Sequence, residues 1–206
     1  LPGSISVLAI AEKGNLFKAP ETYMNKIATG KIDKGLIDLD FPLKKNIKNL
    51  SEFKNKEISS LTVCLLDRPR HKKIIDELKE LNVNLKLITD GDVLGAIYVS
   101  DPKYNVDMFL GIGGGPEGVI AAAALDTYNC HFQGRFIFDN DENIKEAKSM
   151  GIKDLDKKYN LNEIIKGDSI FCATGITNSE ILNGIIFDQK NYTSETLITH
   201  KNSNLK

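Results

Sequence analysis

Residues 61–81 read LTVCLLDRPRHKKIIDELKEL and set the fold class of the chain. The apolar run at 61–66 predicts a buried strand. After a turn at 67–70, apolar residues recur at helical spacing and predict a helix over 70–81; they are Ile74, Ile75, Leu78 and Leu81. A strand, a short turn and a helix in this order form the basic unit of α/β proteins.

The same unit recurs along the chain. Strand and helix pairs are predicted at 85–89 with 92–99, at 108–112 with 117–128, and at 169–173 with 178–183. Strands that alternate with helices predict a largely parallel sheet covered by helices. In such a sheet the turns after the strands collect at one edge, where ligands bind, so we expect four turns to converge there.

The N-terminal third is less regular. Residues 4–11 read as a strand, and residues 20–28 read as a short helical segment that carries Tyr23. Residues 31–56 are rich in Lys, Asn and Asp, and their apolar spacing predicts an amphipathic helix. We expect this segment to connect two parts of the chain, residues 1–56 and residues 57–206.

Composition restricts the function classes. The 206 residues carry a formal net charge of −1, with 41% hydrophobic and 27% charged residues, so a nucleic-acid-binding protein or a disordered tail is not indicated. No apolar stretch approaches the ~20 residues of a membrane span, which favours a cytoplasmic protein without a membrane partner. Cys64, Cys130 and Cys172 lie far apart and show no disulfide framework.

The turn after the first quoted strand is unusual because it concentrates arginine. The chain has three arginines among twenty-seven basic residues, and two of them, Arg68 and Arg70, flank Pro69 at a predicted helix N-terminus. Cations there oppose the helix dipole, whereas bidentate recognition of phosphate or carboxylate would explain the choice of arginine over lysine. The alternative is a surface turn in which Pro69 merely starts the helix.

The second turn, Thr89 to Asp92, places two carboxylates around a glycine. Asp90 and Asp92 could bind sugar hydroxyls or a metal, or Asp92 could simply cap the next helix, with Gly91 forming the turn. The fourth turn, 173–178, offers hydroxyls and a helix cap. The three histidines have no partner at metal-ligand spacing, so a zinc site is not expected.

The third turn, GIGGGPEG at 111–118, leads into an alanine-rich helix. Glycines permit close backbone approach to a ligand. Gly113, Gly115 and Gly118 match the dinucleotide pattern G-x-G-x-x-G, and Asp139 follows at about the ~20-residue distance that the pattern requires. Glu117 argues against this, because its carboxylate would lie where a pyrophosphate binds. A divalent metal would suit Glu117, and a simple partner for the helix dipole is the alternative.

These turns, taken in order, resemble the class II fructose-1,6-bisphosphatases, metal-dependent bacterial enzymes that also occur as fructose/sedoheptulose bisphosphatases in cyanobacteria. The resemblance runs nearly end to end and rests on blocks at 12–14, 19–30, 66–71, 88–93, 111–124, 133–136 and 173–177. By similarity, the family's substrate-contacting positions are Tyr23, Arg68, Pro69, Arg70, Asp90, Gly91, Asp92 and Gly114, and Glu117 is a metal ligand that takes part in catalysis.

The resemblance also implies a fold and a cofactor. The family has a layered α/β/α/β/α fold shared with inositol monophosphatases and uses Mn²⁺ or Mg²⁺. Its other metal ligands lie upstream in acidic motifs, including an Asp-Pro-Leu-Glu-Gly-Thr stretch, that this sequence does not contain. We therefore expect a C-terminal portion of the enzyme, incomplete at the N-terminus: residues 1–56 would finish an N-terminal sheet layer, and 57–206 would form an α/β sugar-phosphate-binding domain.

The implied reaction is hydrolysis of the 1-phosphate of fructose 1,6-bisphosphate by metal-activated water. The arginines would clamp anionic oxygens and the two aspartates would accept bonds from sugar hydroxyls, with a homo-oligomer as a possible assembly. Two alternatives remain open at this stage. One is an NAD-binding oxidoreductase that uses Gly113 to Gly118, and the other is a noncatalytic sugar-phosphate-binding module.

Overall fold

A six-stranded mixed sheet forms the centre of the computed structural model, which describes residues 3–202. Its strand order is β4-β3-β5-β2-β6-β7. The bounds are β2 Tyr23–Thr29, β3 Thr62–Leu66, β4 Asn84–Ile88, β5 Met108–Gly114, β6 His131–Ile137 and β7 Lys158–Asn160. Only β3, β4 and β5 pair in parallel, whereas β2, β6 and β7 join antiparallel. The prediction of a largely parallel sheet is therefore wrong for half of the strands.

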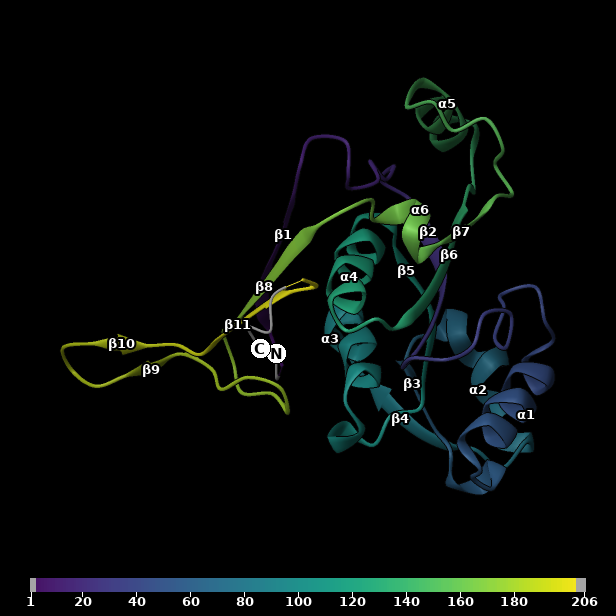
Figure 1. The fold of residues 1–206 in the computed structure, drawn as a ribbon, viewed down its shortest axis with the longest axis horizontal. Helices are drawn as coiled ribbons and strands as arrows, with labels where there is room; N and C mark the ends of the chain where they lie inside the picture. The colour runs from purple at the N-terminus through teal and green to yellow at the C-terminus, as the bar shows by residue number, and fades with distance from the viewer. Residues whose placement is uncertain (1–2, 203–206) are drawn as a thin grey trace.

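A second, smaller sheet is antiparallel throughout. It consists of β1 (Ile5–Ala11), β8 (Ser169–Gly175) and β11 (Thr196–His200), in the order β1-β8-β11. Beyond it, the hairpin of β9 (Ile186–Phe187) and β10 (Tyr192–Thr193) extends away from the body of the molecule (Figure 1).

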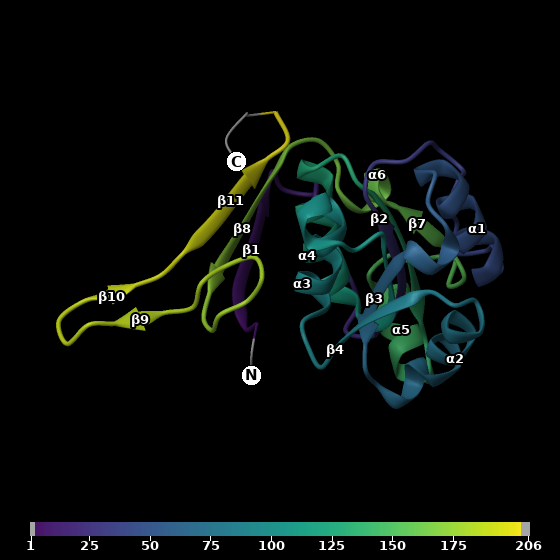
Figure 2. The ribbon, with the colours of Figure 1, turned by 90° about the horizontal axis from the view of Figure 1, so that it is seen from below.

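Helices separate the two sheets. Helices α3 (Asp92–Ile97) and α4 (Gly115–Thr127) lie between them, and α1 (Leu43–Lys54) and α2 (Lys72–Glu80) cover the other face of the large sheet (Figure 2). The four alanines at 121–124 are at most 1% exposed, because α4 packs against sheets on both sides. This layered arrangement confirms the α/β fold class. Among residues 3–202, no helical layer covers the outer face of the small sheet.

The remaining elements are short. They are α5 (Asp141–Ser149), α6 (Leu161–Ile164) and the 3-10 helices η1 (Ile58–Ser60), η2 (Pro69–His71), η3 (Tyr98–Ser100) and η4 (Pro102–Tyr104). No helix within residues 3–202 is both long and apolar enough to cross a bilayer. The three cysteines are free, and burial raises the pKa of Cys64 and of Cys130 to about 12, which suits inert packing residues.

Two predicted helices are not helices. Residues 20–28 contain most of β2, a central strand whose side chains are covered on both faces, so the alternation that marks a half-buried strand is missing. Residues 178–183 form a loop in which the backbone N–H of Leu182 donates to Ser179 Oγ at 2.9 Å. Because β8 is antiparallel to both neighbours, no crossover helix is needed there.

The other predicted elements are confirmed. They are the strands at 4–11, 61–66, 85–89 and 108–112, the amphipathic helix of the polar segment, and the helices after the first three turns. The division of the chain at residue 57 stays a prediction. Three strand pairings cross that point, since β2 pairs with β5 and β6, and β1 pairs with β8.

Candidate active site

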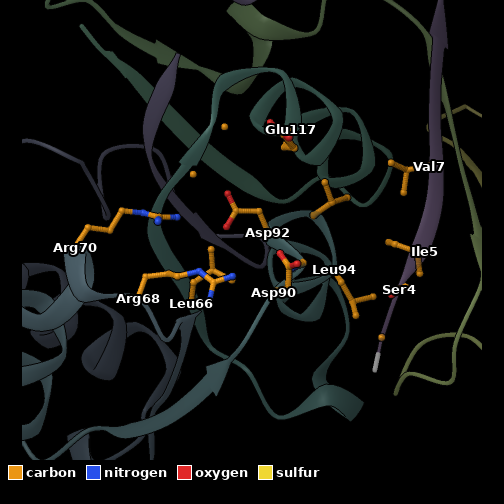
Figure 3. A pocket seen from close by; sticks show the side chains of 15 residues that line it. Ser4, Ile5, Val7, Leu66, Arg68, Arg70, Asp90, Asp92, Leu94 and Glu117 are labelled. Atoms are coloured by element: carbon orange, nitrogen blue, oxygen red, sulfur yellow. The ribbon is translucent and has the colours of Figure 1, made fainter. Parts of the chain in front are cut away.

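A pocket of about 360 Å³ opens where β3, β4 and β5 end, and β1 of the small sheet forms its opposite wall (Figure 3). Seven of the nine residues predicted for the site line it: Arg68, Arg70, Asp90, Gly91, Asp92, Gly114 and Glu117. They come from the first three of the four turns, which therefore converge as expected. The fourth turn only approaches the rim, where Thr177 Oγ1 accepts a hydrogen bond from the backbone N–H of Ser4.

The other two predicted residues lie outside this pocket. Tyr23 is 45% exposed at the start of β2, with its ring centre 5.1 Å from Cζ of Arg70. Pro69 begins η2 and faces away with α2, in line with the purely structural interpretation of this proline. Tyr23 therefore contacts a pocket residue, Arg70, without lining the pocket itself. Pro69 starts η2 and so fixes the backbone between the two arginines.

The arginine turn is fixed by bonds to β5. Arg70 Nε donates to the carbonyl of Ile112 at 2.8 Å, while Arg68 and Arg70 both extend toward the pocket (Figure 3). Among the described residues, neither arginine forms a salt bridge, although thirteen other contacts of that kind are present. Both guanidinium groups are therefore available to an anionic ligand.

His71 holds this turn in place from below. Its ring is completely buried, Nδ1 lies 2.7 Å from the carbonyl oxygen of Leu66, and Nε2 accepts from the backbone N–H of Ile112 at 2.8 Å. A carbonyl needs a donor and an amide needs an acceptor, so the ring is neutral with its proton on Nδ1. This role of His71 could not be predicted from residue types, because both of its partners are backbone atoms.

In the turn at 89–92, Asp92 does not cap α3, contrary to the simpler alternative. Gly91 occupies the N-cap of α3 with φ of 93°, a left-handed conformation that favours glycine, and Asp90 Oδ1 accepts from the Gly91 N–H at 2.9 Å. Asp92 makes no capping bond. Its Oδ2 instead accepts a hydrogen bond from Nζ of Lys26, and its Oδ1 is buried without a partner among the described residues.

Lys26 was missed by sequence reasoning. It lies in the middle of β2, fully buried, and its charged group contacts Asp92. Burial lowers the pKa of Lys26, and the nearby Asp92 and Glu117 carboxylates oppose this effect. A helix was expected for this segment, so nothing in the sequence placed a lysine under the pocket.

The glycines of the third turn make room for protein atoms. A Cβ at Gly113 would overlap Asp92, and a Cβ at Gly114 would overlap the carboxylate of Glu117. A Cβ at Gly118 would lie 2.6 Å from Met24 Sδ. A pyrophosphate at this helix N-terminus would have to share its space with two carboxylates, which argues against the NAD-binding alternative.

The residues present fit a divalent metal only in part. Glu117 is exposed in the first turn of α4 at the pocket, and Asp92 Oδ1 is an unsatisfied carboxylate oxygen nearby in the same pocket. Yet within residues 3–202 no three His, Cys, Asp or Glu side chains lie close enough together to hold a metal ion. The described residues therefore supply two exposed carboxylates in this pocket, those of Asp90 and Glu117, and lack a complete ligand set.

Comparison with known proteins agrees with the resemblance. The D-fructose 1,6-bisphosphatase class 2/sedoheptulose 1,7-bisphosphatase of Synechococcus sp. (strain JA-2-3B'a(2-13)) is 40% identical over 214 residues, which cover 98% of this chain and 62% of the relative. The proteins of that name from Synechocystis sp. (strain ATCC 27184 / PCC 6803 / Kazusa) and Trichodesmium erythraeum are 39% and 37% identical, with the same coverage. The chain thus spans about 62% of the length of these relatives.

A protein-family model described as "Bacterial fructose-1,6-bisphosphatase, glpX-encoded" matches residues 1–205. Together with the relatives, this match shows that the chain belongs to the glpX-encoded family of bacterial fructose-1,6-bisphosphatases.

Proposed function

We propose that the protein to which this chain belongs hydrolyses the 1-phosphate of fructose 1,6-bisphosphate to give fructose 6-phosphate and phosphate. The observation that carries the proposal is a pocket in which two arginines, without salt-bridge partners among residues 3–202, face Asp90, Asp92 and Glu117. Separate cationic and acidic groups in one cleft suit a ligand that has both phosphates and hydroxyls.

Each group has a proposed role. Arg68 and Arg70 bind anionic oxygens, chiefly those of the phosphate that is not cleaved, and Tyr23 supports Arg70 from outside the pocket. Asp90 and Asp92 accept hydrogen bonds from sugar hydroxyls. The backbone at Gly91 and Gly114 forms part of the pocket wall. These contacts orient the substrate, and this orientation is the main contribution to catalysis that we propose for the chain.

Glu117 is the proposed metal ligand. With Glu117 as one ligand, a bound Mn²⁺ or Mg²⁺ would supply a nucleophilic water and would neutralise charge on the transferring phosphoryl group. No group of three ligating side chains is found within residues 3–202. We propose that the remaining ligands of the full-length protein lie in the region that corresponds to the part of the relatives not covered by this chain. The three free cysteines favour a reducing compartment, so the proposed location is the cytoplasm.

The relatives' names include sedoheptulose 1,7-bisphosphatase, and we extend the proposal to that substrate. The pocket is open to solvent and Asp90 in its lining is exposed, so we propose that a sugar longer by one carbon also enters it.

The test is phosphate release by the full-length protein with fructose 1,6-bisphosphate, sedoheptulose 1,7-bisphosphate or fructose 6-phosphate, in Mn²⁺, Mg²⁺ or EDTA. Release is expected from both bisphosphates, with fructose 6-phosphate left intact and with loss of activity in EDTA. A folded, metal-loaded protein that releases no phosphate from either bisphosphate would refute the proposal. Binding of fructose 1,6-bisphosphate without release would favour the noncatalytic module instead.

A further inference from the structure

Lys26 is the only lysine within residues 3–202 that is buried, and its exposed fraction is 0%. Transfer of an ammonium group out of water costs several kcal/mol, and a single partner seldom recovers the whole cost. A lysine at the centre of a sheet therefore needs an explanation beyond stability. Its position next to the candidate active site supplies one.

Three glycines lie next to Lys26, two on the neighbouring strands and one on α4, and the one on α4 leaves room for its side chain. Lys26 is flanked across the sheet by Gly111 of β5 and Gly134 of β6. From α4, Gly118 faces it so closely that an added Cβ would lie 3.2 Å from Lys26 Cε. The missing Cβ of Gly118 thus leaves room for the end of the lysine stem, whose Nζ contacts Asp92.

The two carboxylate oxygens of Asp92 are bonded differently. Lys26 Nζ donates to Asp92 Oδ2, whereas Asp92 Oδ1 has no hydrogen-bond partner among the described residues. Asp92 lines the pocket, but Lys26 does not. One oxygen is therefore held by Lys26, and the other is buried without a partner among the described residues, in a side chain that lines the pocket.

The charges around Lys26 belong to the same site. Asp92 and Glu117 favour its charged form, and Arg70 opposes it. Asp92, Glu117 and Arg70 all line the pocket, on α3, on α4 and on the turn before α2. Lys26 is thus a buried counter-charge beneath the two carboxylates.

We propose that Lys26 is a positioning residue for substrate binding, which acts through Asp92 by fixing Oδ2 and thereby presenting Oδ1 to a sugar hydroxyl. This inference rests on the proposed function of the pocket. It differs from a purely structural role, because a lysine that only filled the core would affect stability and leave the affinity for sugar bisphosphate unchanged.

The experiment measures calorimetric binding of fructose 1,6-bisphosphate to the full-length protein in EDTA, where no turnover is expected, and phosphate release in Mn²⁺. Loss of a hydrogen bond that involves a charged group typically weakens binding by about 10-fold or more. Lys26→Met is therefore expected to raise Kd and KM by about 10-fold, with a smaller change in kcat.

A second variant distinguishes an effect of the Lys26–Asp92 pair on binding from an effect on folding. Lys26→Met leaves a buried carboxylate alone and could prevent folding, whereas Lys26→Met/Asp92→Asn removes both charges. If Lys26 acts through Asp92, the double variant binds no more weakly than Asp92→Asn alone. A double variant that binds substantially more weakly than Asp92→Asn would overturn the inference.

The matched control is Lys54→Met. Lys54 contacts Asp107, which is also buried, at 2.7 Å, but this pair lies at the opposite end of β5 from the pocket. Its loss is expected to lower thermal stability and leave Kd unchanged.

The outcomes distinguish the two proposals. Phosphate release by the unaltered protein together with an unchanged Kd in a folded Lys26→Met variant would overturn the role of Lys26 alone. Binding without release would refute the proposed reaction, and the Kd values would still decide the role of Lys26. Absence of both binding and release would overturn both.

Discussion

Asp92 and Glu117 occupy space that glycine leaves open. A Cβ at Gly113 would overlap Asp92, and one at Gly114 would overlap Glu117. The two carboxylates differ in freedom, because Asp92 is bonded to buried Lys26 whereas Glu117 is exposed. The same substitution at adjacent glycines should therefore have different consequences.

Gly113→Ala is expected to destabilise the fold by about 1–3 kcal/mol, since Asp92 cannot move without breaking its bond to Lys26. Gly114→Ala is expected to leave stability nearly unchanged, because the end of Glu117 can swing away, and to lower metal-dependent activity by about 10-fold or more. Urea unfolding and phosphate release measure the two effects. Equal losses of stability in both variants would contradict this distinction.

The site residues that could be predicted from the sequence are those that stand out within a short stretch of it. Arg68 and Arg70 stand out against a lysine-rich background, and Asp90 with Asp92 form an acidic turn at a strand end. Sequence reasoning missed Lys26 and His71, whose partners Asp92 and Ile112 lie 66 and 41 residues away along the chain. A buried polar residue can be predicted only from the hydrogen-bond partners that it needs, and partners far away in the sequence leave no local pattern.

His131 is predicted to make the stability of the fold depend on pH. Burial lowers the pKa of His131 to about 4, and its Nε2 has no partner among the described residues. An unfolded histidine has a pKa near ~6.5, so the unfolded state takes up the proton first as pH falls. Stability is therefore expected to decrease from about pH 6.5 toward pH 4, with a slope of at most about 1.4 kcal/mol per pH unit.

The His131→Phe variant should lose this dependence between pH 6.5 and 5, as measured by urea unfolding at each pH. The nearby Asp38, whose pKa is lowered chiefly by its hydrogen bond to Lys158 against the opposing effect of burial, contributes only at lower pH, where carboxylates become protonated. An unchanged slope in the variant would contradict the assignment to His131.

At the scale of elements, the strand-turn-helix units of residues 61–128 were predictable because each contains a short apolar run and then a helix with one apolar face. The failures have a common physical cause. β2 is covered on both faces and α4 is buried nearly all round, so periodicity was uninformative in both, and only length distinguished the helix. The antiparallel direction of β2 was set by pairing across the sheet, which local sequence does not encode.

His71 connects the turn after β3 to β5. Its loss would leave the Leu66 carbonyl and the Ile112 N–H without their bonds to the ring. His71→Phe is therefore expected to lower the free energy of unfolding by about 2–4 kcal/mol, in urea unfolding of the full-length protein.

His200→Phe is the control for this variant. His200 lies on β11, 4.0 Å from the exposed carboxylate of Asp168, and its replacement should cost less than about 1 kcal/mol. Similar losses in the two histidine variants would mean that the bonds of His71 do not stabilise the arginine turn.

At the scale of the whole molecule, the outer face of the small sheet is apolar and exposed. Leu8, Ile10, Ile170 and Ile198 are 39–54% exposed, and the register places Ile10 beside Ile170 and Ile198 beside Cys172. The opposite face, with Val7 and Phe171, packs toward α3 and α4. Contiguous apolar surface of this kind favours association.

A chain limited to residues 1–206 is therefore expected to self-associate at micromolar concentration in sedimentation velocity. The Leu8→Lys/Ile198→Lys variant should shift the chain toward monomer, because two ammonium groups on this face oppose its burial. A monomeric unaltered chain at all concentrations would contradict the expectation.

The central claim is that the pocket at the ends of β3, β4 and β5 binds the sugar bisphosphate. The measurement that tests it most directly is kcat/KM for fructose 1,6-bisphosphate in the full-length protein with Arg70→Ala or Arg135→Ala. Arg135 is the third arginine and bonds Asp40 and the carbonyl of Asp156 outside the pocket. We predict a loss of about 100-fold or more for Arg70→Ala and less than about 3-fold for Arg135→Ala, because of these two arginines only Arg70 would contact a phosphate. Equal activities of the two variants would contradict the claim.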